Sequence, residues 1–124
     1  MAAPNIVNVA SITGITTFIA LANTNATVLV SNPASSNKVL KINDIIVANV
    51  DGSSTANITL SINNAAAGGG TAYRVAYQID VAAKTSLVAI DKNASIYLEE
   101  NRSIVATASA GGDLEVVCSY EEIS

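Results

Sequence analysis

The segment IYLEENRSIVATAS, residues 96–109, places two adjacent carboxylates, Glu99 and Glu100, between two apolar runs. Carboxylate pairs act as acid and base in glycoside hydrolysis, and carboxylate oxygens bind hard cations such as Ca²⁺. Neighbouring residues of a strand point to opposite faces, so adjacent carboxylates flank one bond only where the backbone turns sharply. The polar stretch LEENRS fits a strand end followed by a turn. It therefore predicts a structural corner.

Nucleophilic catalysis has little support in the residue types. The chain contains no histidine, which is the usual base for a serine or cysteine nucleophile, and no G-x-S-x-G segment. The single cysteine, Cys118, alternates with apolar residues and is expected to pack as a small hydrophobic side chain. One cysteine also excludes an internal disulfide and a cysteine-based zinc site. We expect a protein that is not an enzyme and uses no cofactor.

The aspartates raise the question of a calcium site. The segments DGSSTAN, from Asp51, and GGDLE, from Gly111, begin like oxygen-rich loops. Both lack the repeated acidic positions and the terminal Glu of an EF-hand loop. Asp and Asn side chains in turns accept hydrogen bonds from the backbone two residues on, which accounts for both segments. We therefore expect no metal site.

Tyr73 and Tyr77 have a spacing that suggests binding. Four residues apart in a strand, they are expected to share one face, with Val75 between them. Such a pair could stack against a sugar, but a tyrosine-lined core edge or subunit interface is the favoured explanation. The two tyrosines are therefore a candidate glycan or interface platform.

Composition limits the partners. Only 13% of the 124 residues are charged and the net charge is −4, with the six Lys and Arg residues scattered. Nucleic acid needs clustered basic residues, so no nucleic-acid partner is expected. No apolar run approaches the roughly 18 residues that span a bilayer, and MAAPNIVNVA lacks the features of a secretory signal. The sparsely charged surface is typical of a subunit in an assembly.

The elements that must position these residues are short strands separated by Gly, Asn, Asp, Ser and Pro. About eight or nine of them, without crossover helices, predict an all-β fold, an antiparallel β-sandwich or jelly roll. From residue 26 onward, strands are expected within ATVLVSN, KVLKINDIIVANV, ANITLSIN, TAYRVAYQIDV, TSLVAI, SIYL, SIVATAS and DLEVVCSYEE.

The alternation of apolar residues predicts which strand faces are buried. One core is expected to hold Ile58, Leu60, Ile62, Leu114, Val116 and Tyr120. In KVLKINDIIVANV, Leu40 and Ile42 have the opposite parity to Ile45 and Val47. A bulge near Asn43 would let both pairs face the core.

The first 25 residues lack clear turn signals. Residues 1–25 are expected to be an N-terminal strand or extended arm, and residues 26–124 the β-sandwich domain. The segment is either an ordinary first hairpin or an arm that reaches a neighbouring subunit. In the second case Ile6, Val7, Val9 and Ile12 are the intersubunit residues.

Four segments carry a resemblance to a known family. They are MAAPNIVNVASITG (residues 1–14), KINDIIVANVDGSSTANITLSI (41–62), TAYRVAYQIDVAAKTSLVAIDKNASIYLEENRSIVATASA (71–110) and DLEVVCSYEEIS (113–124). The chain resembles small virion structural proteins of tailed bacteriophages, especially cyanophages. Where the family corner often has Glu-Gly-Asp-Ser, this chain has EENRS.

The resemblance implies a β-sandwich located in the virion and synthesised in the cytoplasm of a host bacterium. The leading hypothesis is a capsid decoration or cement protein that contacts other virion proteins such as the major capsid protein. The alternatives are a head–tail connector or tail-associated protein, or a receptor- or glycan-binding module at the tail tip. Closed symmetry is common in such particles, so a homo-oligomer is expected, with a trimer the first choice.

Overall fold

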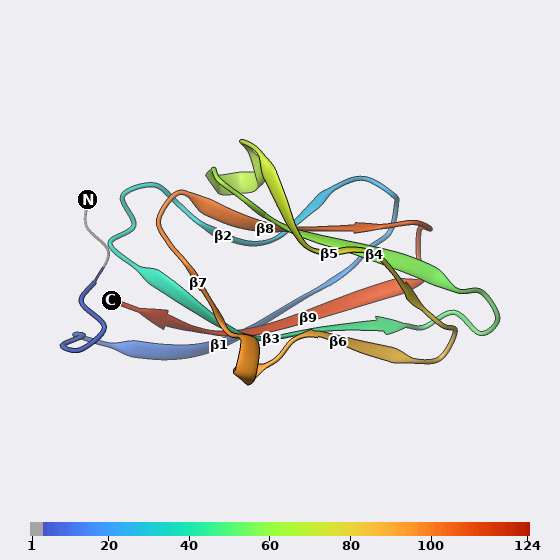
Figure 1. The fold of residues 1–124 in the computed structure, drawn as a ribbon, viewed down its shortest axis with the longest axis horizontal. Coiled ribbons are helices and arrows are strands. Elements are labelled where there is room, and N and C mark those ends of the chain that lie inside the picture. The colour runs from blue at the N-terminus through green and yellow to red at the C-terminus, as the bar shows by residue number, and fades with distance from the viewer. Residues whose placement is uncertain (1–3) are drawn as a thin grey trace.

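The computed structural model describes residues 4–124, in which nine strands form two antiparallel sheets that pack face to face (Figure 1). The strands are β1 (Ile12–Ala20), β2 (Thr27–Asn32), β3 (Val39–Asn49), β4 (Ala56–Asn63), β5 (Ala72–Val81), β6 (Ser86–Ile90), β7 (Ile96–Leu98), β8 (Arg102–Ala108) and β9 (Leu114–Ile123). The helical segments of this range are two single 3₁₀ turns, η1 (Ala66–Gly68) and η2 (Lys92–Ala94). The all-β prediction is confirmed.

Sheet A has the strand order β1-β9-β3-β6, with β7 also paired to β3, and sheet B has the order β2-β8-β4-β5. The pairs are nested along the chain: β1 with β9, β2 with β8, β3 with β6 and β7, and β4 with β5. The chain therefore doubles back on itself as one long two-stranded ribbon. Rolling that ribbon up gives the two facing sheets of a jelly roll.

The core lies between the sheets, where the predicted alternation holds. Ile58 and Leu60 of β4 and Val116 of β9 are fully buried in one continuous cluster. Ile62 and Tyr120 pack against the margin of that cluster and are half-buried. The predicted phases of β4 and β9 are therefore correct.

Strand β3 contains the predicted bulge. Its register against β9 shifts between Ile42 and Asp44, which leaves Asn43 as the extra residue. The shift reverses the pleat, so that Ile42 before it and Ile45 after it both face the core. The side-chain oxygen of Asn43 is buried and has no hydrogen-bond partner among the described residues.

Residues 4–25 do not form a first hairpin. Residues 12–20 form β1, but the partner of β1 is the C-terminal strand β9 and not β2. The nine paired positions run without a break from Ile12 opposite Ile123 to Ala20 opposite Glu115. β1 is therefore the edge strand of sheet A.

Candidate interaction surface

Four apolar side chains form a row across the outer face of sheet A, one each from β1, β9, β3 and β6. The register places Phe18 opposite Val117, Val117 opposite Ile46, and Ile46 opposite Val88. Their exposed fractions are 76%, 39%, 37% and 56% from Phe18 to Val88. Opposed residues of antiparallel strands have Cβ atoms about 4.5–5.5 Å apart, so these side chains are contiguous. We call these four residues the apolar row.

The apolar row departs from the usual pattern of a half-buried sheet. A sheet with one face on the core normally carries polar residues on the other face. Strand β9 follows this rule at Glu115, Ser119 and Glu121 and breaks it at Val117. Exposed apolar residues that gather in one patch mark an interaction surface.

Small and polar side chains border the apolar row on both sides. One flanking row contains Ala20, Glu115, Ala48 and Ser86, and the other contains Thr16, Ser119 and Asp44. An apolar centre with a polar border is the usual anatomy of a protein–protein interface. The border supplies negative charge from Glu115 and Asp44, which favours a partner that is neutral or basic around its own contact.

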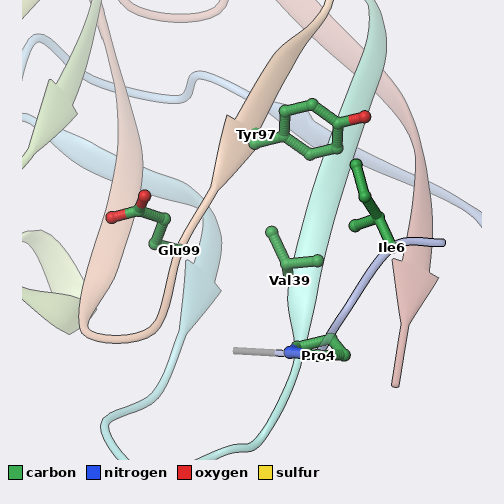
Figure 2. A pocket seen from close by; sticks show the side chains of 5 residues that line it. All are labelled: Pro4, Ile6, Val39, Tyr97 and Glu99. Atoms are coloured by element: carbon green, nitrogen blue, oxygen red, sulfur yellow. The ribbon is translucent and has the colours of Figure 1, made fainter. Parts of the chain in front are cut away.

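A small open hollow lies at the far end of the same face. It has a volume of about 210 Å³ and is lined by Pro4, Ile6, Val39, Tyr97 and Glu99 (Figure 2). Leu40 faces the core, so its neighbour Val39 faces outward. Val39 is nevertheless only 5% exposed and lies outside the core cluster. Pro4 and Ile6 lie beside it in Figure 2, so the N-terminal segment partly covers this end of sheet A.

The residues predicted to form an intersubunit arm are spread over several environments. Ile6 lines the hollow, Val7 is 91% exposed, Val9 is half-buried and Ile12 begins β1. The segment is tied to the C-terminus of its own chain, since the backbone N–H of Ala10 donates to the Ser124 carbonyl at 2.7 Å. The contact of Ile6, Val7, Val9 and Ile12 with a neighbouring subunit stays a prediction.

Tyr73 and Tyr77 are both exposed on the edge strand β5, but the predicted shared face is wrong. Tyr73 lies opposite Ile62 and Ala76 lies opposite Leu60, so one extra residue interrupts the alternation between them. Tyr77, next to Ala76, therefore lies on the outer face of sheet B. There the guanidinium of Arg74 lies 5.5 Å from the centre of its ring, a cation–π contact.

Glu99 and Glu100 lie where the chain crosses from sheet A to sheet B. β7 ends at Leu98, Glu100 and Asn101 form the turn, and β8 begins at Arg102. Glu99 is largely exposed, with an oxygen 4.0 Å from a guanidinium nitrogen of Arg102. The Oε1 atom of Glu100 is buried and has no hydrogen-bond partner in the described range. The two carboxylates form a corner, as the sequence predicts.

Asp51 acts as a turn residue. Its Oδ2 accepts hydrogen bonds from the backbone N–H groups of Ser53 at 3.0 Å and Ser54 at 2.6 Å. These bonds favour the charged form and lower the pKa of Asp51 below its ordinary value. Within residues 4–124 no group of three or more His, Cys, Asp or Glu residues gathers in a way that could hold a metal ion. The same range contains no helix long and apolar enough to cross a membrane.

Cys118 faces the core from β9 and is completely buried. Burial, with a smaller contribution from the charge of Asp44, raises the pKa of its thiol to about 12. The thiolate is the reactive form of cysteine, so Cys118 is inert at neutral pH. The predicted packing role agrees with this environment.

Two buried asparagines that the sequence analysis missed, Asn32 and Asn49, each donate hydrogen bonds to two backbone carbonyls of other segments. Nδ2 of Asn32, at the end of β2, donates to the carbonyls of Lys38 at 2.9 Å and Leu98 at 3.1 Å. Nδ2 of Asn49, at the end of β3, donates to the carbonyls of Ser54 at 2.9 Å and Val81 at 2.8 Å. An asparagine at the end of a strand, just before a turn, is the sequence signal that both share.

Comparison with known proteins shows the fold. No protein-family model matches the chain, and no curated protein matches it. A chain from the disulfide-linked pili that Bacillus endospore appendages form has 15% sequence identity and a TM-score of 0.52, over 92% of this chain and 88% of that one. A chain from the acidic stable capsid structure of the Helicobacter pylori bacteriophage KHP30 has 11% identity and a TM-score of 0.52, over 94% and 90%. The likeness is to the two-sheet β-sandwich, and both structures are assemblies.

Proposed function

We propose that this protein is a structural subunit of a tailed-phage virion, specifically a capsid decoration or cement protein. The observation that carries the proposal is the apolar row, an interaction surface on a jelly roll. The proposed role is binding, and no catalytic step is assigned to any residue.

Three further features support a place in a particle. The fold is similar to that of a chain from a phage capsid structure. With 13% charged residues, the chain has little of the charge that keeps free proteins apart in solution. The sequence also resembles small virion proteins along most of its length. Each feature favours a subunit that functions in contact with other subunits.

The contact that we propose is between the outer face of sheet A and the major capsid protein. Phe18 and Val88, the most exposed members of the apolar row, lie at its two ends, so the contact spans the width of the sheet. A complementary partner surface is apolar at its centre. Basic groups at its border would pair with Glu115 and Asp44.

A head–tail connector or tail-associated subunit is the alternative, because it would use the same surface at another place in the particle. A glycan-binding module at the tail tip has less support. In the register of β5 against β4, Tyr73 and Tyr77 do not share a face of sheet B, which gives less support to one stacking platform.

The number of copies per particle tests the proposal. Quantitative mass spectrometry of particles purified from cells that carry the gene is expected to find hundreds of copies, as repeated attachment to a capsid requires. A few to tens of copies would instead assign the chain to the neck or tail. Absence from purified particles would contradict every virion role.

A further inference from the structure

We propose that two copies of this chain pair along the free edge of β1, antiparallel, around a two-fold axis at Thr16. The two A sheets then become one continuous sheet. The proposed dimer does not depend on the virion role.

Three of the four sheet edges carry features that oppose pairing with another strand. β2 is bulged between Val28 and Val30. β5 is bulged at two places and has Gln78 at a φ of 50°. The opposite edge of sheet A is broken between β6 and β7 by the 3₁₀ turn η2, which contains Lys92. These three edges are poor templates for an added strand.

The β1 edge has none of these features. Its nine residues, ITGITTFIA, include no charge, no proline and no bulge, and they pair with β9 without a shift in register. On its other side, a row of backbone N–H and C=O groups has no strand partner among residues 4–124. A long, regular, uncharged edge of this kind is a template for another chain. Two identical copies approach without repulsion because the strand is neutral.

Geometry restricts the register. A two-fold axis perpendicular to the sheet keeps outward residues opposite outward residues. The residue numbers of every opposed pair therefore add to the same even number, and this sum identifies the register. A sum of 32 centres the pair on Thr16 and uses all nine residues of β1. Sums of 30 and 34 leave two residues of each strand unpaired. Because a fully paired strand exchanges about one hydrogen bond per residue, the register centred on Thr16 is favoured.

The same register gives Phe18 a place to pack. It puts Phe18 of each copy opposite Gly14 of the other, on the outer face. A Cβ at Gly14 would meet no atom within 4 Å, so the space above this glycine is open, and Phe18 is 76% exposed. An aromatic ring that covers a glycine on the neighbouring strand is a known stabilising pair in sheets. The contact covers one side of the Phe18 ring.

The partner that fits this edge is therefore a second copy of the chain. The contact is isologous, which means that both copies use the same surface. Phe18 of each copy lies opposite Gly14 of the other, and Thr16 lies opposite Thr16. It gives a dimer, where the sequence led us to expect a trimer built on the N-terminal arm.

The first test measures the mass of the purified protein by light scattering. We expect twice 12.6 kDa. Thr16→Lys places two ammonium groups opposite each other and is expected to give a folded monomer. Ser86→Lys also introduces a lysine, on the opposite edge strand β6 of sheet A, and this variant is expected to stay dimeric. Circular dichroism checks that both variants are folded.

The second test locates the contact. Thr16→Cys places a thiol directly opposite its copy, so a short bifunctional thiol reagent is expected to join two chains. Ile12→Cys is the control, because the two Ile12 positions would lie eight residues apart, roughly 27 Å. Buried Cys118 does not compete for the reagent.

Several results would overturn the dimer. A wild-type monomer at concentrations up to about 0.1 mM would do so, since a specific contact is expected to be tighter. A dimer that persists in Thr16→Lys, or cross-linking at Ile12→Cys in place of Thr16→Cys, would also exclude this register. A trimer that is lost when residues 2–10 are deleted would assign assembly to the arm.

Discussion

Val116 and Val117 are neighbours in β9 with opposite surroundings. Val116 is fully buried between the sheets, while Val117 belongs to the apolar row. Val116→Ala is expected to lower the free energy of unfolding by about 2–3 kcal/mol through lost burial and a residual cavity. Val117→Ala, the matched control, is expected to change it by about 0.5 kcal/mol or less. Denaturant unfolding measures both. Equal effects would show that the phase of β9 is wrong.

Cys118 makes stability depend on alkaline pH. Its pKa is about 12 in the folded chain against 9.0 for an ordinary thiol. The unfolded thiol therefore ionises first, and the stabilisation, complete below pH 9, is lost progressively as the pH rises towards 12. Cys118→Ala lacks this component, whereas Tyr120 titrates in both proteins. Denaturant unfolding at several pH values compares them, and parallel profiles would contradict the buried thiol.

The buried Asn49 can be tested by replacing it with an ionisable residue of the same shape. Asn49→Asp replaces an N–H₂ donor by an oxygen that faces the Ser54 and Val81 carbonyls. We expect a loss of about 2–4 kcal/mol at neutral pH. Burial raises the pKa of such a carboxyl, so the loss is smaller in acid, where the group is protonated. Asn25→Asp makes the same change at an exposed site. Equal losses of stability in the two variants would contradict a stabilising role for the buried hydrogen bonds of Asn49.

At the scale of elements, the turn from β7 to β8 tests the reading of the adjacent carboxylates. Glu99→Gln removes a long, exposed ion pair with Arg102, and Glu100→Gln replaces a carboxylate with a buried, unpaired oxygen by a neutral amide of the same shape. The double variant is expected to change stability by about 1 kcal/mol or less. The thermal midpoint and incorporation into particles are therefore expected to stay close to wild type. Leu98→Ala, at the buried end of β7, is the control and is expected to cost about 2–4 kcal/mol. A metal or an activity lost from the double variant would overturn the structural assignment.

At the scale of the whole molecule, the apolar row tests the proposed attachment. Ile46→Thr with Val88→Thr keeps the β-branched shape of both residues and makes the row polar. Both side chains are exposed in the isolated subunit, so the fold is expected to survive while attachment to particles falls at least tenfold. Co-sedimentation with particles that lack the protein measures this. Thr107→Val, on the outer face of sheet B, makes that face less polar and is the control. Undiminished attachment of the row variant would exclude this face.

The sequence by itself determined the fold class, the phases of β4 and β9, and the bulge in β3. These features follow from the local order of apolar and polar residues along the chain. The alternation of Ile58, Leu60 and Ile62 states which face is buried, whatever the partner strand is. The parity change between Ile42 and Ile45 likewise requires an extra residue between them. Local chemistry also settled the corner at Glu99 and the turn at Asp51.

Only the tertiary structure decided which strands are neighbours, and the surfaces depend on that. Phe18, Ile46, Val88 and Val117 are unremarkable within their own segments and form a row only because β1, β9, β3 and β6 are adjacent in sheet A. The same holds for the bulge in β5, which separates Tyr73 from Tyr77 through its pairing with β4. Side-chain periodicity records burial but not partner identity, because many strands bury an equivalent apolar face equally well. The order of the strands depends on how the whole two-stranded ribbon folds into two sheets, which involves contacts between residues far apart in the sequence.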